Sequence, residues 1–223
     1  MDFTRRVFVS GALAASFLTT LSGAAEAAPG AAVDPAFTVL DGLSELRFTD
    51  LALQRLRSLG ITVYAVAPAT VITGADGSTV EGVSMRPEYG TFALSPDGTP
   101  SHAAGRGLGG VGLRTGQASL EIADIRGDLT DNKVYAFLKV NDQWIGELPL
   151  YTGDPSQIRL ALSPGAPNQP STIKGTNIPV TPTQEALDAF EKAFGSSLFT
   201  TQDTVFTASG QGHAWPLPVS PVS

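Results

Sequence analysis

A regular series of short, alternating segments in the second half of the chain restricts the folds open to it. They cover residues 118–125, 133–140, 144–151 and 158–162, with turn-forming Asp131-Asn132 and Asn141-Asp142 between them. Short segments at this spacing are typical of antiparallel sandwiches and barrels. The 24 glycines and 16 prolines favour many turns over long helices. We therefore expect an all-β to α+β fold, built as an antiparallel β-sandwich or barrel-like sheet.

Two short amphipathic helices are expected to accompany the sheet. The first follows a cap at Thr49 or Asp50, repeats leucine every three residues and ends at Gly60. The second is predicted over residues 181–195, with Thr181 as its N-cap and an apolar stripe along one face. Both patterns resemble helices that cover the end of a sheet.

The remaining segments are assigned by β-branched alternation and by turn residues. Further strands are predicted at residues 61–66, 79–85, 91–94 and 204–208. The glycine-rich residues 105–112 are expected to form a flexible hairpin loop or a place where something approaches the backbone closely. Residues 163–179 are predicted as a long crossing loop.

The N-terminus is predicted to be a twin-arginine export signal. Arg5 and Arg6 precede Phe8 and an apolar run, and Ala25-Glu26-Ala27 offers small residues for cleavage. The predicted organisation is a signal at 1–27, a linker at 28–36, a single β-rich domain at 37–208 and a proline-rich tail at 209–223. We expect a secreted or extracytoplasmic protein with no membrane span after signal cleavage.

Composition argues against several classes of function. The formal net charge of −7 makes the chain a poor partner for nucleic acid. Having no cysteine, it cannot build thiolate metal sites, and two histidines at positions 102 and 213 do not make a zinc motif. The spacing Gly105-x-Gly107-x-x-Gly110 matches a dinucleotide fingerprint but opens a strand-like segment rather than a helix. No residue pattern supports catalysis, so we expect a non-enzymatic protein.

His102 and the tyrosines are the candidate ligand-binding residues. His102 lies beside the glycine-rich segment among small side chains, where solvent reaches it. A tyrosine phenolate is a hard ligand suited to ferric iron, and a nearby cationic side chain lowers the pKa at which it forms. The chain has four tyrosines, Tyr64, Tyr89, Tyr135 and Tyr151.

From the first helix onward the chain resembles the haem-binding HtaA-type domain of secreted and surface proteins of actinobacteria. The resembling segments are Leu56-x-x-Leu59-Gly60-Ile61-Thr62-Val63 with Ala67-Pro68-Ala69, Ser101-His102-x-x-Gly105-x-Gly107-Leu108, residues 134–140, and residues 181–195 with Phe199. They span residues 46–208. The family usually opens with a tryptophan-containing segment before its ligand tyrosine, whereas residues 28–48 here contain neither tryptophan nor tyrosine.

The resemblance implies a β-rich domain that holds haem through a tyrosine assisted by a histidine and passes it on without chemistry. His102 matches the family's histidine, and Tyr89 or Tyr64 is the candidate tyrosine. We expect an exported binding domain for haem binding or transfer. The alternatives are a cell-surface or adhesion domain that binds a protein or glycan, and, less favoured, a secreted hydrolase using His102 or His213.

Overall fold

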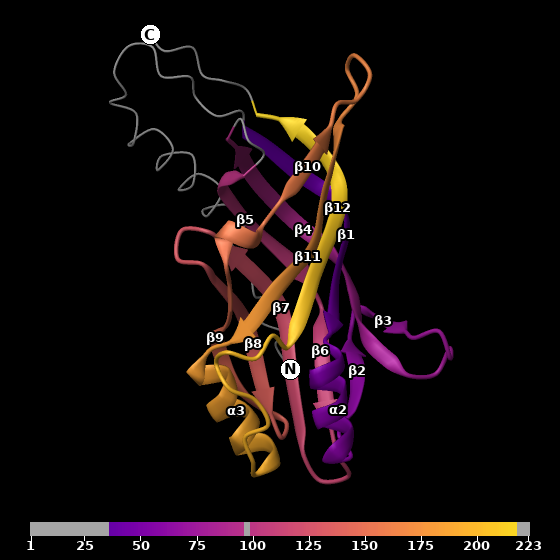
Figure 1. Cartoon of the computed structure of the whole chain (residues 1–223), viewed down its shortest axis with the longest axis vertical. Helices are drawn as coiled ribbons and strands as arrows, with labels where there is room; N and C mark the ends of the chain where they lie inside the picture. The colour runs from indigo at the N-terminus through magenta and orange to yellow at the C-terminus, as the bar shows by residue number, and fades with distance from the viewer. Residues whose placement is uncertain (1–35, 96–98, 218–223) are drawn as a thin grey trace, which may run out of the picture. The chain divides into compact units, whose positions relative to one another are not determined.

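The computed structural model describes residues 36–95 and 99–217 (Figure 1). The predicted signal at 1–27, the linker up to residue 35 and the last six residues of the predicted tail lie outside the described residues. The described elements are β1 (Ala36–Phe48), α2 (Asp50–Ser58), β2 (Thr62–Val66), β3 (Thr70–Thr73), β4 (Val80–Leu94), β5 (Pro100–Leu108), β6 (Gly110–Arg114), β7 (Ser119–Asp128), β8 (Lys133–Val140), β9 (Gln143–Gly153), the 3₁₀ turn η1 (Pro155–Gln157), β10 (Leu160–Ser163), β11 (Ser171–Pro182), α3 (Gln184–Phe194) and β12 (Phe206–Pro216).

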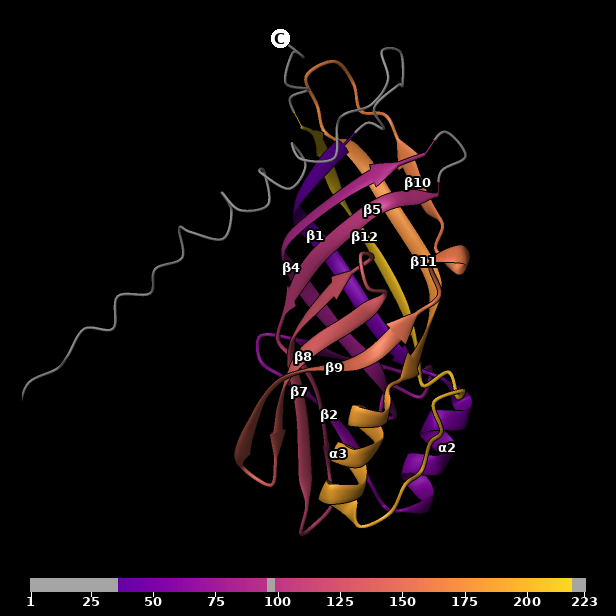
Figure 2. The ribbon, with the colours of Figure 1, turned by 90° about the vertical axis from the view of Figure 1, so that its left-hand side faces the viewer.

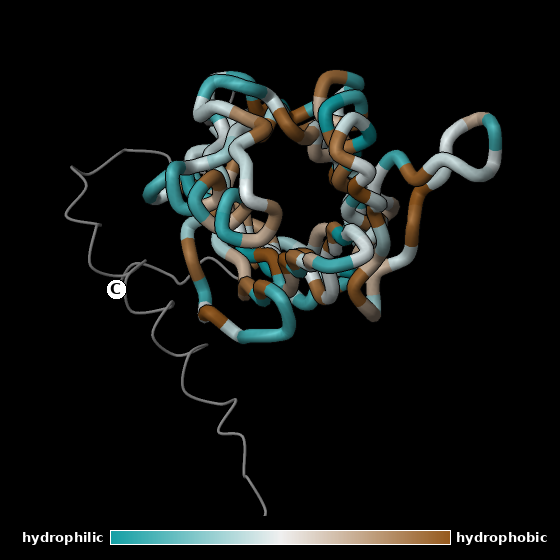
Figure 3. Tube along the Cα trace, turned by 90° about the horizontal axis from the view of Figure 1, so that it is seen from below, coloured by the Kyte–Doolittle hydropathy of each residue, from teal (hydrophilic) through white to brown (hydrophobic). Residues whose placement is uncertain are grey.

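The strands form one antiparallel sheet that returns to itself. Its order is β2-β6-β7-β5-β4-β1-β12-β11-β9-β8, and β8 also pairs with β7. This last pairing closes a ring of β7, β5, β4, β1, β12, β11, β9 and β8, and Figure 3 shows the chain running around a central space. The predicted antiparallel sheet with two short helices is confirmed.

Both helices begin at a capping threonine whose hydroxyl also donates to a backbone carbonyl distant in the sequence. The Thr49 hydroxyl accepts from the Ala52 N–H and donates to the Thr204 carbonyl at 2.8 Å, as expected for the first helix. For α3 the predicted cap was wrong, because Thr181 pairs with Thr152 in the β9–β11 ladder. Thr183 caps instead, accepting from the Ala186 N–H and donating to the Pro149 carbonyl at 2.6 Å. Among the described residues, no helix is long and apolar enough to cross a membrane.

Three predicted loops or breaks are strand. Residues 79–85 and 91–94 belong to the single strand β4, which continues through a bulge next to Tyr89. Most of the predicted tail that is described forms β12, and β11 occupies the end of the predicted loop at 163–179. The inner face of β12 carries Phe206, Ala208, Gly210, Gly212 and Ala214, so small residues conceal its alternation. Pairing with β1 and β11 on its two sides makes it a strand.

The glycine-rich segment is also strand rather than flexible loop. It supplies the end of β5, a turn at Gly109 with a φ of 81°, and the start of β6. A side chain at Gly110 would collide with the Ile122 carbonyl, and one at Gly112 would collide with the Tyr64 ring. The alternative expectation for this segment, a close approach to the backbone, is what the structure shows.

Buried side chains form two separate clusters. The larger lies at the end where α2 and α3 cover the sheet, and it includes Leu56, Leu138 and Leu150, each at most 1% exposed (Figure 2). The smaller gathers around Phe37 and Phe92, whose rings stack with centroids 5.0 Å apart. Strands of the ring contribute to both clusters, so the space between them lies within the ring.

Candidate functional site: a chamber within the strand ring

A cavity of about 380 Å³ separates the two apolar clusters. Its wall takes Val39, Leu160 and Ile173 from the smaller cluster and Tyr151 and Phe206 from the larger. All eight strands of the ring and β10 contribute to the wall. We call this cavity the chamber, and its volume lies within the range of small-molecule sites, about 300–1,000 Å³.

One wall of the chamber is a row of directly paired residues that crosses six strands. The row runs Val39, Gly90, Gly105, Gly127, Val134 and Tyr151, each paired with the next across its ladder. Residues directly opposite one another share a face of the sheet, and every member of this row lines the chamber. Three consecutive glycines therefore leave the middle of the wall without side chains.

A second row on other strands is also thinned by glycine. It runs Leu160, Gly175, Gly210, Ser44 and Met85, paired in that order, and all five line the chamber. Gly107 and Gly212 add two more glycines to the wall. The chamber exists because these positions lack side chains, whereas large side chains fill the ring in the two apolar clusters on either side.

Tyr151 is the buried tyrosine of the chamber. It is 8% exposed and packs edge-on against Phe206, with ring centroids 5.3 Å apart. Burial raises the pKa of its phenol well above the ordinary value, so the phenol is neutral at physiological pH. No hydrogen bond joins its hydroxyl to another described residue, and no buried side-chain oxygen there lacks a partner, so this hydroxyl keeps some accessible surface for a ligand or water.

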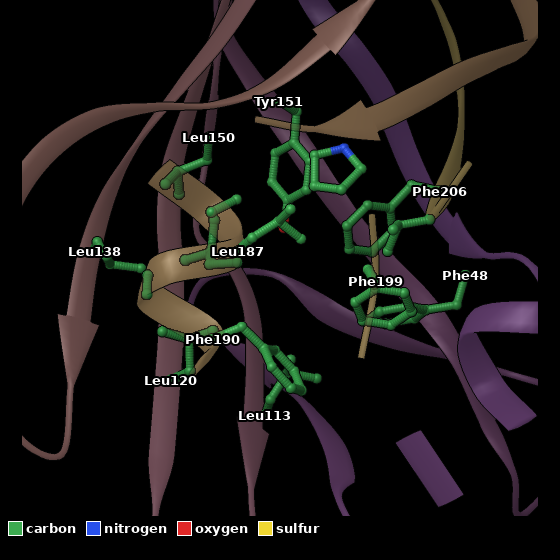
Figure 4. Close-up of a pocket in the computed structure, with 15 residues that line it drawn as sticks. Phe48, Leu113, Leu120, Leu138, Leu150, Tyr151, Leu187, Phe190, Phe199 and Phe206 are labelled. Carbon is green, nitrogen blue, oxygen red and sulfur yellow. The ribbon is translucent and has the colours of Figure 1, made fainter. Parts of the chain in front are cut away.

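Tyr151 also borders a second, much smaller cavity of about 30 Å³ beneath α3. Figure 4 shows Leu187 and Phe190 of α3 turned toward leucines of β6, β7 and β8 around it. A cavity of this volume holds about one water molecule. The Tyr151 side chain therefore stands between the chamber and the helix-covered core.

The structure places His102 away from the chamber. His102 of β5 pairs with Ala93 of β4, and the next residue, Ala103, packs on the cluster of Phe37 and Phe92. Neighbouring residues on a strand point to opposite faces, so His102 faces outward while Ala103 faces inward. His102 does not line the chamber.

The two tyrosines proposed from the sequence lie apart from each other. Tyr89 lines the chamber wall within the bulge opposite Arg106, and 36% of its surface is exposed. The Tyr64 ring lies over Gly112 on the β2–β6 pair, and its hydroxyl donates to Glu121 at 3.0 Å. Burial, followed by this hydrogen bond, raises the pKa of Tyr64 to about 12. The structure therefore brings Tyr89 to the chamber but not Tyr64 or His102.

The other histidine forms an exposed hydrogen bond with an aspartate. His213 Nδ1 lies 3.0 Å from an Asp41 carboxylate oxygen, and hydrogen bonding to His213 lowers the pKa of Asp41. Within residues 36–95 and 99–217, no serine or threonine hydroxyl bonds to His213, and no cluster of three acidic or histidine side chains could hold a metal. The pair lacks the nucleophile that a hydrolase requires.

The sequence-based interpretation missed the glycine rows, Ser44 and the role of Tyr151. A signal for part of this was present, because Gly105 and Gly107 recur with the period of two that marks one face of a strand. The partners of Gly105 on neighbouring strands are far from it in the sequence, so only the ladder registers bring them together.

No protein-family model matches this chain, and no curated protein matches it in sequence. Among solved structures, the C-terminal domain of HtaA from Corynebacterium glutamicum is similar, with a TM-score of 0.49 and 12% identity. The similarity covers 80% of this chain and 99% of that domain. The function is therefore inferred from the chamber.

Proposed function

We propose that this chain is an exported, non-enzymatic binding domain that holds an apolar ligand in the chamber. The observation that carries the proposal is the pair of glycine-thinned rows, which leave about 380 Å³ open between two packed apolar clusters. Leaving so much apolar surface unpacked costs stability, and a ligand that fills the space recovers the lost contacts. Apolar walls with few polar groups are typical of small-molecule sites.

Haem is the specific ligand implied by the family resemblance, and the described residues fit it only in part. The walls suit an apolar macrocycle, and Tyr151 or Tyr89 would supply the oxygen ligand to the iron, which provides the coordination chemistry when bound. The expected tyrosine–histidine pair is not assembled, because His102 faces outward on β5. Haem binding would thus rest on a tyrosine without His102.

Two titrations test the proposal and its specific ligand separately. The neutral solvatochromic dye Nile red reports apolar binding, and we expect saturable, blue-shifted fluorescence at micromolar protein. Failure of the dye to bind would overturn the proposed function. Hemin absorbance tests haem: a Soret shift lost in Tyr151→Phe or Tyr89→Phe, but kept in Tyr64→Phe, would assign haem to the chamber. No shift, or one that survives both substitutions, would exclude haem as its ligand.

A second candidate function, binding of a protein or glycan at the surface, is favoured by one observation. Trp144 is 66% exposed and Phe137 and Ile145 are 37% and 40% exposed, all on the β8–β9 hairpin. Exposed aromatic residues are enriched at recognition surfaces. Retention of dye binding but loss of cell-surface attachment in Trp144→Ala would support this function, and unchanged attachment would count against it.

A further inference from the structure

Four residues that line the chamber carry hydroxyls, Ser44, Tyr89, Tyr151 and Ser209. Ser209 accepts from the Asn177 N–H, and Ser44 and Tyr151 belong to the two rows of the wall. Ser44 pairs with Gly210 and Met85 in the second row, and a side chain at Gly210 would lie 3.7 Å from its hydroxyl oxygen. Ser44 therefore points to the inner face with Gly210. Tyr151 ends the first row and is more than nine-tenths buried.

Neither the Ser44 hydroxyl nor the Tyr151 hydroxyl has a hydrogen-bond partner among the described residues. No buried side-chain oxygen or nitrogen there lacks a partner, so both hydroxyl oxygens keep some accessible surface. A ligand that presents a hydrogen-bonding oxygen would take the place of water at these hydroxyls.

The charged residues of the wall are engaged elsewhere. Glu45 follows the inward Ser44 along β1, so it faces outward, and its carboxylate lies 3.2 Å from Arg47. Arg106 lies between Gly105 and Gly107 and forms ion pairs of 3.4 Å with both Glu88 and Asp124. An ionised group drawn into the chamber would find no free counter-charge on its inner face.

From this arrangement we infer that the chamber selects an uncharged, largely apolar ligand that carries an ester, ketone or alcohol oxygen. Burial of an unpaired charge is far more costly than burial of a neutral group that forms a hydrogen bond. The Tyr151 phenol donates to a carbonyl or ether oxygen, and the Ser44 hydroxyl either donates or accepts. This inference rests on the proposed function and names the ligand class of the same site, a class that leaves out haem because its two propionates are ionised.

Displacement of Nile red by twelve-carbon probes tests the ligand class. The probes are methyl laurate, 1-dodecanol, dodecane and laurate, each below its aggregation concentration, at pH 8, where laurate is ionised. We expect methyl laurate and 1-dodecanol to displace the dye at concentrations at least tenfold lower than laurate. Equal or stronger displacement by laurate would overturn the inference and leave the binding function standing.

Substitutions of the two hydroxyl residues locate the polar contact. Tyr151→Phe is expected to weaken methyl laurate about fivefold, the loss of one hydrogen bond, and to leave dodecane unchanged. Ser44→Ala should weaken 1-dodecanol in the same way, with Tyr64→Phe as the outer-face control. Equal effects on dodecane and on the oxygen-bearing probes would overturn the assignment. Absence of dye binding by the unsubstituted protein would be a failure of the proposed function instead.

Discussion

Gly105 of β5 lies directly opposite Gly127 of β7, and both line the chamber. Gly90 continues the row on one side and Val134 on the other. A row of paired glycines stabilises a sheet weakly, because glycine has no side chain to pack and loses more backbone entropy on folding than other residues. Its placement between two packed clusters is what opens a space inside the ring.

Filling that space from Gly127 should abolish binding without unfolding the protein. A side chain built at Gly127 has no atom within 4 Å and points into the chamber beside Val134. We expect Gly127→Leu to lower Nile red affinity at least tenfold while its melting temperature stays equal or rises. The matched control is Gly116→Leu, at a turn residue with equally open surroundings outside the chamber. Equal affinities for the two variants would place the ligand elsewhere.

Other glycines are required because neighbouring backbone lies too close for a side chain. Substitution by alanine distinguishes these glycines from those that line the chamber. Gly109 has a φ of 81°, and a side chain there would meet the backbone of Ala69 and Val66. Gly109→Ala is expected to lower the free energy of unfolding by about 2–4 kcal/mol, through strain and overpacking. Gly127→Ala should change it by less than about 0.5 kcal/mol. Urea denaturation checks both, and similar losses would show that chamber glycines are structural as well.

Alkaline pH should weaken the contribution of Tyr64 to stability. Its pKa is raised to about 12 in the folded chain, against about 10 when unfolded. The folded state therefore keeps the proton longer, so this stabilisation is complete below pH 10 and is lost as the pH rises through 12.

Removal of the Tyr64 hydroxyl tests that titration. Tyr64→Phe is expected to cost about 1 kcal/mol at pH 8, because Glu121 loses a hydrogen bond. The difference between wild type and variant should shrink at pH 11 and above. Tyr151 is present in both chains, so its own raised pKa cancels in the comparison. A difference that stays constant in urea unfolding from pH 8 to 11.5 would contradict the prediction.

The cap of α3 should contribute to the stability of the whole domain. Thr183→Ala removes both the cap to Ala186 and the hydrogen bond to the Pro149 carbonyl. We expect a loss of about 1–2 kcal/mol in thermal or urea unfolding. Thr183→Ser keeps the hydroxyl and should retain most of the stability that Thr183→Ala loses. If Ser were as unstable as Ala, packing of the threonine methyl rather than capping would explain the loss.

Most of the local structure follows from the residues of each segment. Alternation and turn residues placed β8 at its observed bounds and β2, β7 and β9 within a few residues, and threonine and glycine signals located both helices. These elements form where a segment's own residues carry the preference. Prediction failed at β12 and the glycine-rich strands, whose inner faces carry small residues and so lack an apolar alternation. It failed at β11 because a register shift between Gly175 and Ile178 interrupts the alternation of its apolar residues.

Pairing between distant segments closes the strands into a ring and places Gly90, Gly105 and Gly127 in one row. Strand register is set by pairing between segments distant along the chain, such as β1 with β4 and β12. The same registers turn His102 outward and bring Ser44 and Tyr151 into the chamber wall. A sequence specifies which residues alternate along a strand, but which face becomes the inside is settled when the ring closes around its two cores.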